Sequence, residues 1–246
     1  MPPGLLEPIT ASLGLAGLDL TALSLGWARA APVIVIVPAF GLRALPGPVR
    51  AVIGLALAAT IGPAVSADPS LATHGLVAGL VAAFAQGIPI AIAAAVPLWA
   101  ATMAGGVVDC VRNANETVSM PAVEGRPTPL GVPMALIASA AFLSMGGPAR
   151  VAAALCVPMA VPGNLALMRA ALDIAAGVQI AVAIAAPVLA AAVVVELGGA
   201  LVARAASPAQ VHALLAPARS FAILAVAALL LDRMAGVAAL AVHARP

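Results

Sequence analysis

The feature that most constrains this chain is a long run, from Gly75 to Val108, that contains no charged side chain. One membrane crossing takes about 20 apolar residues, so the run is too long for one ordinary span and short for two. The whole chain is 64% hydrophobic and only 8% charged, whereas a soluble domain carries about a quarter of its residues as charges. Such a chain cannot cover its own surface with polar groups, and lipid or other subunits must surround it.

Several further apolar runs lie between sparse charges, and together they predict an all-α, multi-span membrane protein built of kinked or broken helical hairpins. Gly87, Pro89 and Pro97 interrupt the longest run and predict either a kinked helix or a tight hairpin there. We expect residues 1–246 to form one hydrophobic domain, with a polar loop at about 109–130. The other apolar runs cover about 20–40, 51–65, 130–148, 151–168, 174–195 and 220–242.

Arg29 lies near the middle of the first apolar run. An arginine at the centre of a membrane helix costs about 2.5 to 3.5 kcal/mol on the insertion scale. This cost brings the first run close to break-even for insertion. We therefore expect Arg29 to face another helix, a carboxylate or water.

Other charged residues are candidates for contacts. Asp109, Arg112 and Glu116 are spaced for one helical face, and their pairing is either an inter-subunit salt bridge near a gate or an ordinary pair at a helix end. Glu196 ends a long apolar run, as an interfacial anchor or as the acid of a proton-coupled relay. By the positive-inside rule, Arg50 and Arg204 place their connections on the cytoplasmic side.

The sequence contains no set of residues typical of catalysis. There is no Ser-His-Asp set and no phosphate-binding glycine-rich loop, and Cys110 and Cys156 are isolated. We therefore expect no enzyme, no metal and no cofactor. One alternative class is a small-solute or ion-coupled multi-pass transporter, which predicts an inverted repeat and a polar pocket at broken helices; no convincing repeat is seen.

Four stretches of the sequence, in a fixed order, form a recognisable pattern. They are Arg29 with Pro38–Gly41 and Pro46–Arg50; Ala104–Gly105 with Asp109 and Arg112; Ala141–Leu143 with Gly146–Gly147; and Ala186–Leu189 with Glu196, Arg204 and Pro208. With these stretches the chain resembles, over about residues 25–235, the type III secretion export-apparatus family called SctT in injectisomes and FliR in flagella, and the second stretch is closer to the injectisome form. Glu196 stands where the family more usually has Asp, and the segment after Pro208 lacks the family's Asn and Phe.

The resemblance implies a structural and gating subunit of a helical export gate in the bacterial inner membrane. Its implied partners are SctR/FliP-like and SctS/FliQ-like subunits, with SctU/FlhB-like and SctV/FlhA-like subunits nearby, and its implied cargo is unfolded secreted protein. Low aromatic content and abundant small residues also favour burial among other helices. The residues predicted to make assembly and gating contacts are Arg29, Arg50, Asp109, Arg112, Glu116, Glu196 and Arg204.

Overall fold

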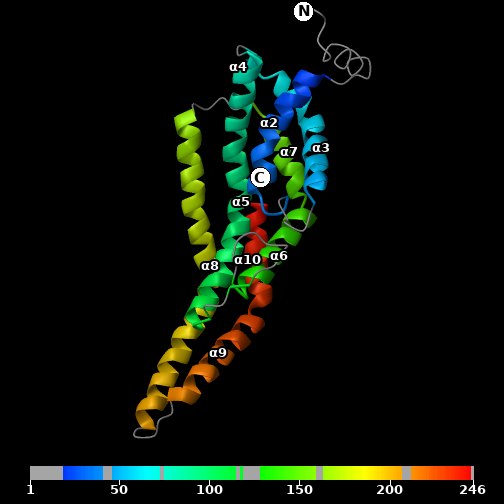
Figure 1. Ribbon diagram of the computed structural model, residues 1–246. Coiled ribbons are helices and arrows are strands. Elements are labelled where there is room, and N and C mark those ends of the chain that lie inside the picture. The colour runs from blue at the N-terminus through cyan, green and yellow to red at the C-terminus, as the bar shows by residue number, and fades with distance from the viewer. Residues whose placement is uncertain are drawn as a thin grey trace, which may run out of the picture. The chain divides into compact units, whose positions relative to one another are not determined.

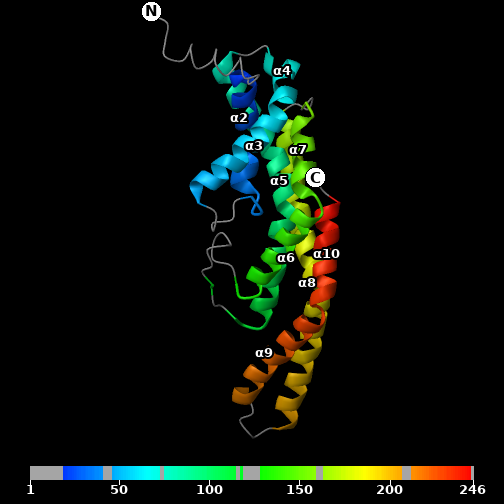
Figure 2. The same ribbon diagram turned by 90° about the vertical axis from the view of Figure 1, so that its right-hand side faces the viewer.

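The computed structural model shows an α-helical chain that forms two compact units, with no strand among the residues it describes (Figures 1 and 2). Unit 1 comprises residues 1–95 and 146–172, and unit 2 comprises residues 96–145 and 173–245. This confirms the all-α class, whereas the single domain stays a prediction. The described residues are 19–40, 46–72, 75–114, 117–118, 128–158, 163–206 and 212–244.

Unit 1 is built around helices α2 (Leu20–Ile36) and α3 (Gly47–Ser66), which pack along each other (Figure 1). Short α4 (Pro69–Ala72) follows, and α7 (Gly147–Cys156) packs against α3. The carboxylate of Asp19 caps α2 by accepting from the Thr21 N–H at 2.8 Å.

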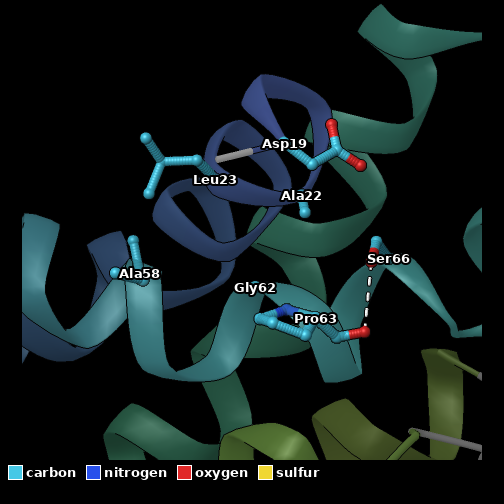
Figure 3. Close-up of a pocket in the computed structure, with 8 residues that line it drawn as sticks. Asp19, Ala22, Leu23, Ala58, Gly62, Pro63 and Ser66 are labelled. Atoms are coloured by element: carbon cyan, nitrogen blue, oxygen red, sulfur yellow. Dashed lines mark hydrogen bonds between the residues drawn. The ribbon is translucent and has the colours of Figure 1, made fainter. Parts of the chain in front are cut away.

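Helices α2 and α3 approach each other closely at Gly26 and Gly62, and Figure 3 shows Ala22 of α2 and Ala58 and Gly62 of α3 in this region. A Cβ atom added to Gly26 would lie 2.6 Å from the Ala58 carbonyl oxygen, and one added to Gly62 would lie 2.9 Å from that of Ala22. Small residues permit this approach, as is usual between membrane helices.

Unit 2 contains the C-terminal part of α5 (Leu76–Val111), α6 (Gly131–Ser144) and the larger part of α8 (Gly163–Ala205). It ends with α9 (His212–Leu229) and α10 (Leu231–His243), which form a pair bent by 56°. Helix α10 packs against α6, and α9 lies beside the C-terminal half of α8 in both views (Figures 1 and 2).

Among the described residues, three helices are long and apolar enough to cross a membrane: α3, α5 and α8. The number rises to five if the bent pairs α6–α7 and α9–α10 each count as one span. Between α6 and α7 the chain turns through Gly146, whose φ of 73° is a left-handed conformation that glycine adopts without a steric cost. The expected bent and broken helices are therefore present.

Several segments differ from those expected. Of the two alternatives for residues 75–108, a kinked helix or a tight hairpin, the hairpin is wrong, because α5 is one helix of 36 residues. No polar turn interrupts it, and membrane helices tolerate internal proline. The apolar run 151–168 is also not one segment. Helix α7 ends at Cys156 and Val157 is extended, because a residue that precedes proline disfavours the helical conformation.

The polar loop at 109–130 begins later than expected, because α5 continues through Asp109 to Val111. The last run, 220–242, is likewise two helices rather than one. The first run ends as a helix at Ile36 and leaves Val37 extended before Pro38. The run 174–195 is helical throughout and is extended at both ends into α8.

Candidate functional site

Arg29 is completely buried within unit 1 and is the largest fully buried side chain among the described residues. Its Nη1 atom lies 3.5 Å from Oδ2 of Asp68, and its Nη2 atom donates to the carbonyl oxygen of Val157 at 2.6 Å. Of the surroundings expected for Arg29, another helix, a carboxylate or water, the structure shows the Asp68 carboxylate and the end of α7. A buried charge is tolerated only when it is paired and hydrogen-bonded in this way.

Three separate segments position this cluster of Arg29, Asp68 and Val157. Asp68 lies between α3 and α4 and is itself buried, and Val157 is the C-cap of α7. A cation beside a helix C-terminus is also favoured by the helix dipole. Gly87 completes the packing, because a Cβ atom there would collide with the Arg29 carbonyl oxygen of α2.

The sequence interpretation did not name Asp68 as the partner. A usable signal was present, because Asp68 is the only acidic residue between Asp19 and Asp109. The Val157 carbonyl carried no signal, since any residue offers a carbonyl oxygen and the contact spans 128 positions.

A second cluster forms around Asp109 in unit 2, where this side chain is fully buried. Its Oδ1 accepts from Arg112 Nε at 2.7 Å, and its Oδ2 accepts from the Leu130 N–H, also at 2.7 Å. The predicted pairing of Asp109 with Arg112 is confirmed, and it lies within the chain. Glu116 lies outside the described residues.

This cluster joins the end of α5 to the start of α6. Leu130 is the N-cap of α6, so Asp109 satisfies a backbone donor that the helix leaves open. A Cβ atom on Gly105 would collide with the Leu130 carbonyl oxygen. Gly105 therefore lets α5 lie close to the start of α6, and Asp109 accepts the hydrogen bond from the Leu130 N–H. Arg112 holds the Asp109 carboxylate in place.

A third cluster connects Glu196 on α8 with Arg219 on α9. Arg219 Nε lies 2.8 Å from Glu196 Oε2, and Arg219 Nη2 donates to the carbonyl oxygen of Val111, the last residue of α5, at 3.0 Å. Both side chains are partly open to their surroundings, at 32% and 53% exposure. Arg219 was not among the predicted site residues, although its basic charge stands directly before the apolar run 220–242.

The remaining predicted residues lie at helix ends. Arg50 is in the first turn of α3 in unit 1 and is partly buried. Arg204 is in the last turn of α8 in unit 2, where it is exposed and complements the helix dipole. The predicted residues that the structure describes therefore belong to separate clusters or lie at single helix ends.

None of the described clusters resembles a catalytic or metal centre. Within the described ranges, no three His, Cys, Asp or Glu side chains gather as metal ligands. The open groove of about 280 Å³ at the α2–α3 crossing has Asp19 as its one charged lining residue (Figure 3). Each cluster ties the end of one helix, α7 or α5, to another segment of the same unit, which is a structural task.

Comparison with protein families gives one match over almost the whole chain. Residues 20–243 match the family described as Bacterial export proteins, family 1. The comparison with curated proteins finds no match. The matched region includes the three clusters of Arg29, Asp109 and Arg219.

Proposed function

The chain belongs to the bacterial export proteins, family 1, the FliR and SctT family, and from this premise we propose that it is a structural and gating subunit of the export gate in the bacterial inner membrane. It is a non-enzymatic, multi-pass membrane component of a type III or flagellar export apparatus. The family match over residues 20–243 is the observation that carries the proposal. It also decides against the alternative of a solute transporter.

Exposed apolar side chains on the helices support a role inside an assembly. Val52 of α3 is 65% exposed and Leu201 of α8 is 67% exposed. Meanwhile, the buried carboxylate of Asp109 is hydrogen-bonded within the chain. Helices with internally satisfied charges and open apolar faces are suited to packing against lipid or against other apolar helices.

We assign the partners from the family and from the apolar character of these exposed helix faces. They are SctR/FliP-like and SctS/FliQ-like hydrophobic subunits, with SctU/FlhB-like and SctV/FlhA-like subunits adjacent. The cargo is unfolded protein. The spacing of Gly105, Asp109 and Arg112 favours the injectisome branch over the flagellar branch.

Co-purification and genetic deletion test the proposal together. After mild detergent extraction, the tagged chain should come out with two smaller hydrophobic proteins in fixed excess. Deleting its gene should stop the export of secreted proteins while motility continues, if the injectisome assignment holds. A stable single chain that moves a small solute in liposomes would overturn the proposal.

A further inference from the structure

The groove between α2 and α3 in unit 1 has a polar end and an apolar end. Figure 3 shows the Asp19 carboxylate and the Ser66 hydroxyl at one end, and Leu23 and Ala58 towards the other. The small residues along the groove suit the packing of a further helix. The residues that line it are Asp19, Ala22, Leu23, Ala58, Ala59, Gly62, Pro63 and Ser66.

The polar groups of the groove offer hydrogen-bond acceptors. Among the described residues, the Asp19 carboxylate accepts only from the Thr21 N–H, which leaves its second oxygen open. The Ser66 hydroxyl donates to the Pro63 carbonyl oxygen at 3.1 Å, so its own oxygen is left to accept. Because Pro63 has no N–H, the carbonyl oxygen of Ala59 lacks its helical donor. A group with several donors therefore fits the polar end.

The charge of Asp19 is not balanced within the described part of the chain. Helix α2 begins at the polar end of the groove and α3 ends there, so the positive end of one helix dipole lies beside the negative end of the other. The two dipoles offset each other and leave the carboxylate as the net charge. No ion pair among the described residues includes Asp19, and the last turn of α3 has no basic residue. The complementary ligand is therefore a cation.

A basic side chain matches both ends of the groove. The aliphatic stem of an arginine or a lysine packs on apolar surface while its charged head lies at a polar site. A guanidinium fits best, because it carries five N–H donors. No described arginine of this chain pairs with Asp19, and residues 1–18, directly before the groove, contain no Arg, Lys or His. The source is then a second protein.

We propose that this groove receives an arginine or lysine side chain from a membrane helix of a neighbouring export-gate subunit, and that the cationic head pairs with Asp19. The inference rests on the proposed function and assigns one contact within the export gate. The stem of the side chain lies along Leu23 and Ala58. The neighbouring helix packs against the small residues of α2 and α3.

Two substitutions at Asp19 separate its charge from its helix cap. Asp19→Asn removes the charge and keeps a favourable N-cap, whereas Asp19→Glu keeps the charge with a poorer cap. In the tagged full chain, Asp19→Asn should lower the yield of the two small hydrophobic partners by about tenfold or more, as expected for the loss of one member of a buried interfacial charge pair. Secretion should fall with it, and Asp19→Glu should retain both. Asp232→Asn, in the first turn of α10, is the matched control.

The opposite order, with full partner yield for Asp19→Asn and loss for Asp19→Glu, would show that the cap alone matters and would overturn the proposal. Full yield for both variants would overturn it as well. Where both variants lose the partners, cross-linking decides, with a photoreactive benzoylphenylalanine in place of Leu23 in the native membrane. An adduct with a partner helix, beside a basic residue, supports the proposal. Adducts only with residues 1–18, phospholipid or cargo, or no adduct, would contradict it.

The wild-type chain separates this inference from the proposed function. If it neither carries the two partners through purification nor restores secretion to the deletion strain, the proposed function fails. If it does both and Asp19→Asn behaves in the same way, only the contact at Asp19 fails.

Discussion

The Nη2 atom of Arg29 lies 2.6 Å from the carbonyl oxygen of Val157, although 128 positions separate the two residues. This bond connects the first helix of the described chain to the end of α7, and Asp68 lies on the other side of the guanidinium. The family resemblance places an arginine in this helix. The structure shows that its task is to hold distant segments of unit 1 together.

Arg29→Met should therefore destabilise the protein by about 3–5 kcal/mol, because the buried carboxylate of Asp68 loses its cation. The measurement is the thermal unfolding midpoint of the detergent-extracted assembly, with the amount of protein in the membrane as a second readout. Adding Asp68→Asn should recover part of the loss. The exposed Arg169 provides the control, and Arg169→Met should leave the midpoint nearly unchanged. Equal effects of the two arginine substitutions would contradict the prediction.

Gly87→Ala should destabilise the same cluster by steric overlap alone. The added methyl group would collide with the Arg29 carbonyl oxygen, and overpacking of this kind costs about 1–3 kcal/mol. Gly198→Ala is the control, since nothing lies within 4 Å of its added Cβ atom. It should stabilise α8 by about 0.5–1 kcal/mol. Unfolding midpoints of the two variants should therefore move in opposite directions.

Much of the fold could be predicted from the sequence because the signals are local. The apolar runs that became α2, α3 and α8 were located correctly, and Asp109 and Arg112 were paired from their spacing on one helical face. Helix ends were less predictable. Pro158 accounts for the end of α7 at Cys156. This end is hard to predict, because the apolar residues on both sides of Pro158 read as one continuous run, 151–168.

The tertiary contacts could not be read from spacing. Asp109 accepts from the Leu130 N–H, and Arg219 donates to the Val111 carbonyl oxygen. In both cases one partner is a backbone group, which is present at every residue and so leaves no pattern in the sequence. The ion pair of Glu196 with Arg219 depends on α9 lying beside α8, which hydrophobicity alone does not determine.

Glu196→Gln should change stability by less than about 1 kcal/mol, because its ion pair with Arg219 is exposed and screened. This small effect contrasts with the large loss expected for Arg29→Met. Thermal unfolding at low and at high salt measures the difference. The wild-type midpoint should fall slightly as salt is added, and the Glu196→Gln midpoint should respond less. A loss comparable with that of Arg29→Met would show that the pair is buried in the assembly.

Substitutions at Asp109 should separate its two contacts. Asp109→Asn keeps one acceptor oxygen and should cost about 1 kcal/mol, whereas Asp109→Ala leaves the Leu130 N–H and the Arg112 guanidinium without their partner and should cost about 2–4 kcal/mol. Asp232→Asn, in the exposed first turn of α10, is the control and should have little effect. Unfolding midpoints of the assembled protein provide the ranking.

Charge reversal then tests the role of the same pair in export. Asp109→Arg should block secretion, and adding Arg112→Asp should restore it only in part. The exchange rebuilds an ion pair, but it does not return an acceptor to the Leu130 N–H, which lies 2.7 Å from Asp109 Oδ2 in the wild type. Secretion of cargo into the medium, normalised to the amount of the chain in the membrane, is the measurement. Complete rescue would show that the bond to Leu130 is dispensable, and no rescue at all would show that the two charges act independently.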